Sequence, residues 1–190
     1  MFEQITILLS FVFAVALTHL LSSATDLVLR RDRAHFSGLL ALWMLNALIG
    51  LVVNWLSIWQ LHIVTHWTVA DVLLQFAPAI LQYFACSLVS IRVEGDAPLD
   101  MPAFYARQRP AFTGAFAAMM MANLIQNYLY RNSTAGISGS DWILEDLLVT
   151  LMLAAAIVGG WARPVWLQWA GGLTMCVLES YFLATFAITA

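Results

Sequence analysis

Charged residues in this chain are confined to short segments, and long uncharged stretches separate those segments. A transmembrane helix needs ~20 mostly apolar residues to cross ~30 Å of hydrocarbon, so each long uncharged stretch is a candidate membrane span. Hydrophobic residues make up 62% of the sequence and charged residues 10%, and the mean hydropathy is +0.84. These values lie outside the range of soluble globular domains, so we predict a protein embedded in a lipid bilayer.

Six membrane spans are predicted, and together they form a single transmembrane domain over residues 1–190. Glu3 stands where a signal peptide has its positively charged start, so we expect the first span to be retained. The predicted fold class is therefore all-α, a bundle of six transmembrane helices. These helices are expected at residues 3–29, 36–59, 69–92, 108–130, 140–161 and 164–188, with a cytoplasmic loop at 93–107.

The arginines indicate how the predicted bundle is oriented, because basic residues collect in cytoplasmic loops. Arg131 alone falls on one side of the membrane. We therefore expect that side to be non-cytoplasmic and to hold both termini, with the bacterial cytoplasmic (inner) membrane as the location. The loops on the opposite side hold Arg30, Arg31, Arg33, Arg92, Arg107, Arg109 and Arg163.

A weak internal repeat accompanies the predicted spans. Phe36–Gly38 resembles Phe112–Gly114, and Arg109–Pro110 recurs as Arg163–Pro164. Such a repeat would fit three tandem helix hairpins, although apolar sequences with few residue types also match by chance. The six-helix prediction does not depend on it.

Several classes of protein are excluded by composition. The chain has no lysine, so Schiff-base chemistry such as that of a retinal pigment is excluded. The arginines lie in short loops without forming a basic face, so we expect no nucleic-acid partner. Cys86 and Cys176 both lie in apolar stretches and are predicted to be small core residues. Sequence motifs for phosphate binding, for a nucleophile elbow or for a zinc protease are absent, and no cofactor is specified.

Polar residues recur at helical spacing inside the predicted spans, which places them on faces that meet protein or water. Glu179 is the most informative, because an unpaired carboxylate at mid-membrane costs ~2.5–3.5 kcal/mol. Interhelical hydrogen bonds in any six-helix bundle would produce similar polar stripes. The alternative is a path for an ion or substrate. Its predicted residues are Glu179, Glu145, Asp146, Asn123, Asn127, Gln75 and Asn54 in the outer half, and His19 and Asp26 at the inner end.

A metal site is a weaker prediction. His62 and His66 are spaced i, i+4, which places two imidazoles on one face of a helix, and Asp71 is near enough in sequence to be a third ligand. Histidine is also common at membrane interfaces, so the pattern has low specificity.

Three functional hypotheses follow from these patterns. The first is a small permease or channel-like protein for a cation or a proton-coupled solute, with an acidic cleft on the outer side. The second is a non-catalytic integral subunit of a larger membrane complex or a homo-oligomer, which the short loops favour. The third is a membrane-embedded enzyme acting on a lipid or a quinone, which would require a cluster such as His19 with Asp26 to reach a lateral opening.

Overall fold

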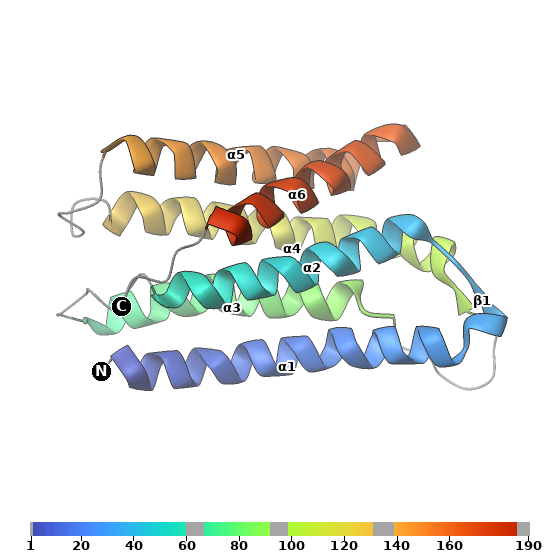
Figure 1. Cartoon of the computed structure of the whole chain (residues 1–190), viewed down its shortest axis with the longest axis horizontal. Coiled ribbons are helices and arrows are strands. Elements are labelled where there is room, and N and C mark those ends of the chain that lie inside the picture. Colours follow the sequence, from blue (N-terminus) through green and yellow to red (C-terminus); the bar gives the residue numbers. More distant parts are fainter. Residues whose placement is uncertain (1, 60–66, 92–98, 131–138, 186–190) are drawn as a thin grey trace.

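The computed structural model describes residues 2–59, 67–91, 99–130 and 139–185 (Figure 1). In these ranges the chain forms six long helices, which confirms the predicted all-α class. Short elements flank them: the 3-10 turn η1 (Arg31–Arg33) and the strands β1 (Ala34–His35) and β2 (Leu99–Asp100). The helices are α1 (Phe2–Leu29), α2 (Gly38–Ser57), α3 (Val69–Val89), α4 (Met101–Tyr130), α5 (Gly139–Trp161) and α6 (Val165–Thr185).

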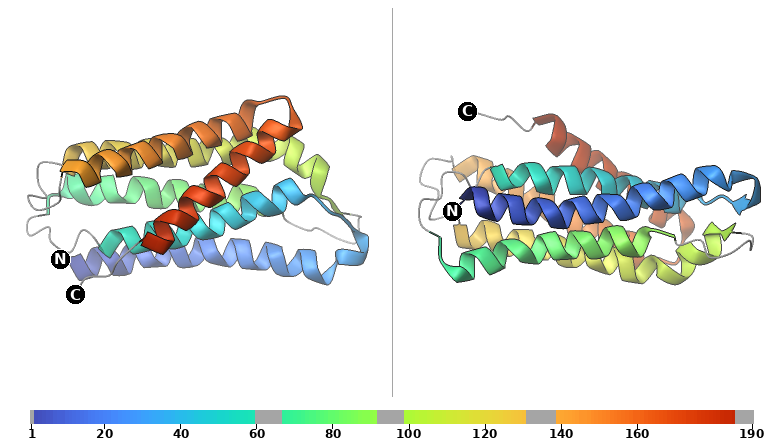
Figure 2. Two further views of the ribbon diagram at one scale, coloured as in Figure 1. Left: turned by 45° about the horizontal axis from the view of Figure 1, so that its top comes forward. Right: turned by 90° about the horizontal axis from the view of Figure 1, so that it is seen from below.

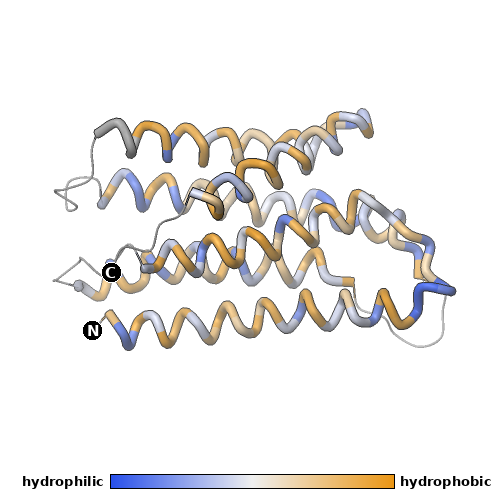
Figure 3. Tube along the Cα trace, in the orientation of Figure 1, coloured by the Kyte–Doolittle hydropathy of each residue, from blue (hydrophilic) through white to orange (hydrophobic). Residues whose placement is uncertain are grey.

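Four of the described helices are long and apolar enough to cross a membrane: α1, α2, α3 and the Ile143–Trp161 part of α5. This finding indicates a membrane-embedded protein. Figure 3 shows the same trend, since hydrophobic residues dominate the helices and a hydrophilic stretch marks the connection from α1 to α2. Judged on their described residues, helices α4 and α6 do not reach the same combination of length and apolar composition.

The helices lie side by side along the long axis, except that α6 crosses the others at an angle (Figures 1 and 2). Helix α1 packs on α2 and α3, α3 packs on α4, and α4 packs on α5. Helix α6 contacts α5 and then crosses α2, which joins the two sides of the bundle. Helix α1 starts at one end of the bundle, and α6 runs toward that same end (Figures 1 and 2). The described arginines all lie at the opposite helix ends or their connections: Arg30, Arg31, Arg33, Arg107, Arg109 and Arg163.

Side chains at the helix starts satisfy backbone N–H groups that have no partner within the helix. The Ser37 hydroxyl accepts a hydrogen bond from the Leu40 N–H at 3.4 Å, at the start of α2. At the start of α3, Thr68 and Asp71 form a capping box, in which each side chain accepts from the other residue's backbone N–H. These local signals explain why the observed starts of α2 and α3 lie close to the predicted ones.

Helix α4 begins at Met101, so residues 101–107, predicted to belong to a loop, are helical. The Asp100 side chain accepts a hydrogen bond from the Ala103 N–H at 3.0 Å and caps the helix there. Strands β1 and β2 pair in parallel just before it, Ala34 with Leu99, and fasten the α1–α2 connection to this start. The first turns of α4 lie at an angle to the rest (Figure 2), near Pro110, which has no N–H to continue the helical hydrogen bonds.

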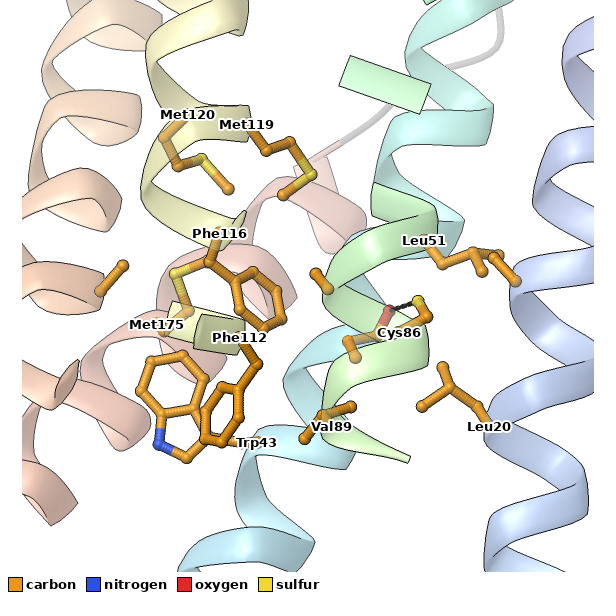
Figure 4. Close-up of a cluster of buried hydrophobic side chains, with 14 of the residues drawn as sticks. Leu20, Trp43, Leu51, Cys86, Val89, Phe112, Phe116, Met119, Met120 and Met175 are labelled. Carbon is orange, nitrogen blue, oxygen red and sulfur yellow. Dashed lines mark hydrogen bonds between the residues drawn. The ribbon is translucent and has the colours of Figure 1, made fainter. Parts of the chain in front are cut away.

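The core at the centre of the bundle is built from aromatic and sulfur-containing side chains (Figure 4). The Trp43 ring lies 5.6 Å from that of Phe112 and 5.4 Å from that of Phe116, measured between centroids. Met119 and Met175 are fully buried beside them. Both cysteines are free thiols; Cys86 is buried in the core, as predicted, whereas Cys176 is only partly buried and lies outside the core.

Candidate functional site

A cavity of about 130 Å³ lies in the half of the bundle that holds the start of α1 and the end of α6. All six helices contribute to its lining, and this volume is large enough for several waters. Helix α1 contributes apolar side chains, whereas the other helices contribute amides, hydroxyls and carboxyls. The polar lining residues are Asn54, Ser57, Gln75, Asn123, Gln126, Asn127, Tyr130, Glu145 and Glu179.

Glu179 on α6 is the most deeply buried acid at this cavity, with only 1% of its surface exposed. Neither of its carboxyl oxygens has a hydrogen-bond partner within the described part of the chain. The carboxyl group lies against Gly50 of α2: a Cβ at residue 50 would be 2.7 Å from Oε1 of Glu179 and 3.6 Å from Oε1 of Gln82. The missing side chain of Gly50 is therefore what makes room for the carboxyl group.

The amides next to Glu179 use their N–H groups elsewhere. The Asn54 amide donates to Oε1 of Gln82 at 2.9 Å and to the Met119 sulfur at 3.1 Å. The Gln82 amide donates in turn to the Ala47 carbonyl at 3.0 Å. These bonds connect α2, α3 and α4 beside Glu179 and occupy the amide groups of Asn54 and Gln82.

A second polar group lies nearer the helix ends. The Asn127 amide donates to Oδ1 of Asp146 at 3.1 Å, and the Tyr130 hydroxyl donates to Oδ1 of Asp71 at 3.3 Å. Asp71 also caps α3 through Thr68, so its carboxylate already has structural hydrogen bonds. These contacts join α3, α4 and α5 at the part of the cavity nearest the end of α4 and the start of α3.

Two further amides face the cavity. Gln75 is buried, and its side-chain nitrogen has no partner among the described residues. Gln126 donates to the Leu74 carbonyl at 2.7 Å. Gln75 therefore keeps a donor that a bound water or ligand oxygen can use, whereas Gln126 mainly joins α4 to α3.

The structure brings together six of the nine predicted path residues in the lining of one cavity: Glu179, Glu145, Asn123, Asn127, Gln75 and Asn54. Asp146 contacts this group through Asn127. Gly50, Gln82 and Tyr130 were not predicted as site residues. Helical spacing nevertheless places all three on the polar faces of the predicted spans, because Gly50 lies four residues before Asn54, Gln82 seven after Gln75 and Tyr130 seven after Asn123.

His19 and Asp26, predicted for the inner end of the path, do not line the cavity. The hydroxyl oxygen (Oη) of Tyr83 lies 3.5 Å from Nε2 of His19, within hydrogen-bonding distance, and the two rings meet edge to face with their centroids 5.6 Å apart. The structure gives no hydrogen bond or ion pair between the described side chains of His19 and Asp26. Along α2, Trp43 lies between the helix start at the arginine end and the cavity residues Gly50 and Asn54, so the buried core around Trp43 lies between that end and the cavity.

The predicted metal ligands His62 and His66 lie outside the described residues. The third, Asp71, serves as the helix cap described above. Among the described residues, no three His, Cys, Asp or Glu side chains lie close enough together to hold a metal ion.

The arginine end contains a separate hydrogen-bonded group that fastens α4 to the α5–α6 turn. The Tyr105 hydroxyl donates to Oε1 of Gln168 at 3.2 Å, and the Gln168 amide donates to the Ala162 carbonyl at 3.2 Å. Arg109 donates to the same carbonyl at 3.3 Å. Burial raises the pKa of Tyr105, which precedes the predicted span, and the nearby Arg109 charge opposes that shift. Tyr105 is therefore a neutral hydrogen-bond donor there.

Comparison with known proteins adds no relative: no family model matches the sequence, and neither a curated protein nor a solved structure matches the chain. The function must therefore be argued from the cavity itself.

Proposed function

We propose that this protein is a small permease or channel-like protein for a cation or a proton-coupled solute. The observation that carries the proposal is the cavity, in which the unpartnered carboxyl group of Glu179 and the side chain of Glu145 line one space among amides. Carboxyl and amide oxygens replace the hydration shell of a cation and repel an anion. No arginine or histidine is among the described residues of the lining.

In this proposal all six helices span the membrane, including α4 and α6. Exposed apolar side chains on α6 recur every four residues, at Val165, Trp169, Leu173, Val177 and Tyr181. Helix α4 has a similar exposed stripe at Met121, Ile125 and Leu129. Such stripes are typical of helices that face lipid on one side and protein on the other.

The proposed orientation places both termini outside the cytoplasm and the arginine end inside it. The arginines gathered at one end of the bundle support this assignment, because basic residues are retained on the cytoplasmic side. The cavity then lies in the outer half of the membrane. A small inner-membrane protein of this kind would take its cation or solute from the non-cytoplasmic side.

Transport requires the cavity to connect alternately with the two sides. In this structure the core around Trp43, Phe112 and Phe116 closes the route toward the arginine end. We propose that His19 and Asp26 belong to the inner end of the route, which opens when this core rearranges. Glu179 lies where α6 crosses α2, against Gly50, so a movement of α6 relative to α2 would change the surroundings of its carboxyl group.

The test is flux into liposomes that contain the purified protein. Glu179→Gln keeps the size and hydrogen-bonding capacity of the side chain but removes its charge, so cation-dependent flux should fall to the level of protein-free liposomes. Glu3→Gln is the matched control, because Glu3 is an exposed acid at the start of α1 and should leave flux unchanged.

Three results would contradict the proposal. Flux of Glu179→Gln equal to wild type would show that this carboxyl group has no part in transport. Absence of flux for every cation tested, together with a partner that co-purifies reproducibly in mild detergent, would favour the non-catalytic subunit. A co-purifying lipid or quinone that the protein converts would favour the enzyme.

A further inference from the structure

At the interface between α2 and α6, unpaired buried oxygen acceptors outnumber unpaired buried donors among the described residues, the one such donor being Nε1 of Trp43 beside Gly172. Three side-chain oxygens there have no hydrogen-bond partner among the described residues: both carboxyl oxygens of Glu179 and Oδ1 of Asn46. Asn46 is 0% exposed and uses its amide nitrogen for the Gly172 carbonyl of α6, at 3.0 Å. Buried polar atoms are nearly always hydrogen-bonded, so this excess of acceptors indicates that a positively charged or hydrogen-donating species is bound here.

We infer that the ion bound at Glu179 is a proton, held as a carboxylic acid between α6 and the Gly50 face of α2. This inference rests on the proposed function and names the coupling ion. A proton on the carboxyl group turns one acceptor oxygen into a donor, which supplies what the interface lacks. It also removes the charge of a side chain that has no basic partner at the cavity.

The surroundings of Glu179 suit a metal ion less well. Mg²⁺ and Ca²⁺ require about six or more oxygen ligands. On one side the carboxyl group meets the backbone of Gly50, because a Cβ there would be only 2.7 Å from Oε1. Oε1 of Gln82, on the same side, already accepts a hydrogen bond from Asn54. Within the described ranges, no cluster of three His, Cys, Asp or Glu side chains is present to complete a metal site.

The other titratable groups near Glu179 come from three helices. Glu145 of α5 and Tyr130 of α4 line the same cavity, and Cys86 of α3 lies one turn from Gln82. The described parts of α1 and α2 that line the cavity contribute no titratable side chain. Glu145 is the other carboxyl group in the described lining of the cavity, and it is therefore the appropriate comparison.

Infrared spectroscopy of the purified wild-type protein in lipid vesicles tests the inference without a transport assay. At neutral pH we expect a carboxylic-acid C=O band that shifts in D2O. Glu179→Gln should lose that band, and Glu145→Gln should keep it. Addition of Na⁺, K⁺ or Mg²⁺ should leave the band intact.

Absence of a D2O-sensitive band in wild type would overturn the inference, as would its retention in Glu179→Gln. Loss of the band when one metal cation is added would show that Glu179 binds that cation instead. Because the wild-type measurements need no variant, misfolding of Glu179→Gln does not prevent the test. Flux that depends on Glu179 but follows a Na⁺ gradient would leave the proposed function standing while the proton assignment fails.

Discussion

Replacement of Gly171 by alanine should loosen the contact between α5 and α6. A Cβ at residue 171 would lie 2.7 Å from the Ala155 carbonyl oxygen and 2.7 Å from the Gly159 nitrogen. Both atoms belong to the backbone of α5, so no side-chain rotation relieves the overlap and the helices must move apart. Overpacking of this kind costs ~1–3 kcal/mol.

Gly114→Ala is the matched control. Gly114 also lies inside a helix, but a Cβ there would be 3.8 Å from the ring of Trp161, which is an ordinary contact. The gain in helix propensity from glycine to alanine, about 1 kcal/mol, applies to both substitutions and cancels in the comparison. The difference in stability between the two variants should therefore equal the cost of overpacking, ~1–3 kcal/mol.

The assay is thermal unfolding in one detergent at one scan rate, since membrane proteins often unfold irreversibly. For a chain of this size 1 kcal/mol shifts the midpoint by about 2–4 °C, so Gly171→Ala should unfold about 2–12 °C below Gly114→Ala. Equal midpoints, or a higher midpoint for Gly171→Ala, would refute the close approach of α6 to the α5 backbone.

Three further predictions concern other parts of the chain. Trp43→Ala should lower the unfolding midpoint strongly, because Trp43 is 0% exposed and loss of a buried tryptophan costs ~3–5 kcal/mol; an unchanged midpoint would contradict its place in the core. A reporter active only in the cytosol should work at Gly95 and be silent after Ala190, and a bright signal after Ala190 would reverse the orientation. If His62 and His66 bind a metal, elemental analysis should find a stoichiometric transition metal that the double alanine variant lacks; metal-free wild-type protein would remove this prediction.

The positions of the helices could be predicted from the sequence because hydrophobicity, charge and capping are local properties. Predicted helix 69–92 and observed α3 (Val69–Val89) start at the same residue, where Thr68 and Asp71 form a local cap. The exception is the start of α4: Asp100 caps it locally, but its first turns are also fastened by Tyr105 to Gln168, far away in sequence. No local sequence pattern indicates the contact between Tyr105 and Gln168, because the two residues are 63 positions apart.

Helical spacing also determined which polar residues share a face, and the count of residues from Pro164 placed Glu179 in the second half of its span. It could not determine what each face meets, because the rotation and crossing angle of a helix depend on its neighbours. His19 therefore meets Tyr83 outside the cavity, whereas Gln75, Asn123 and Glu145 converge on it. Only the tertiary structure places the Glu179 carboxyl group against Gly50, because the backbone contact at Gly171 sets how α6 lies on α5 and thus where it crosses α2.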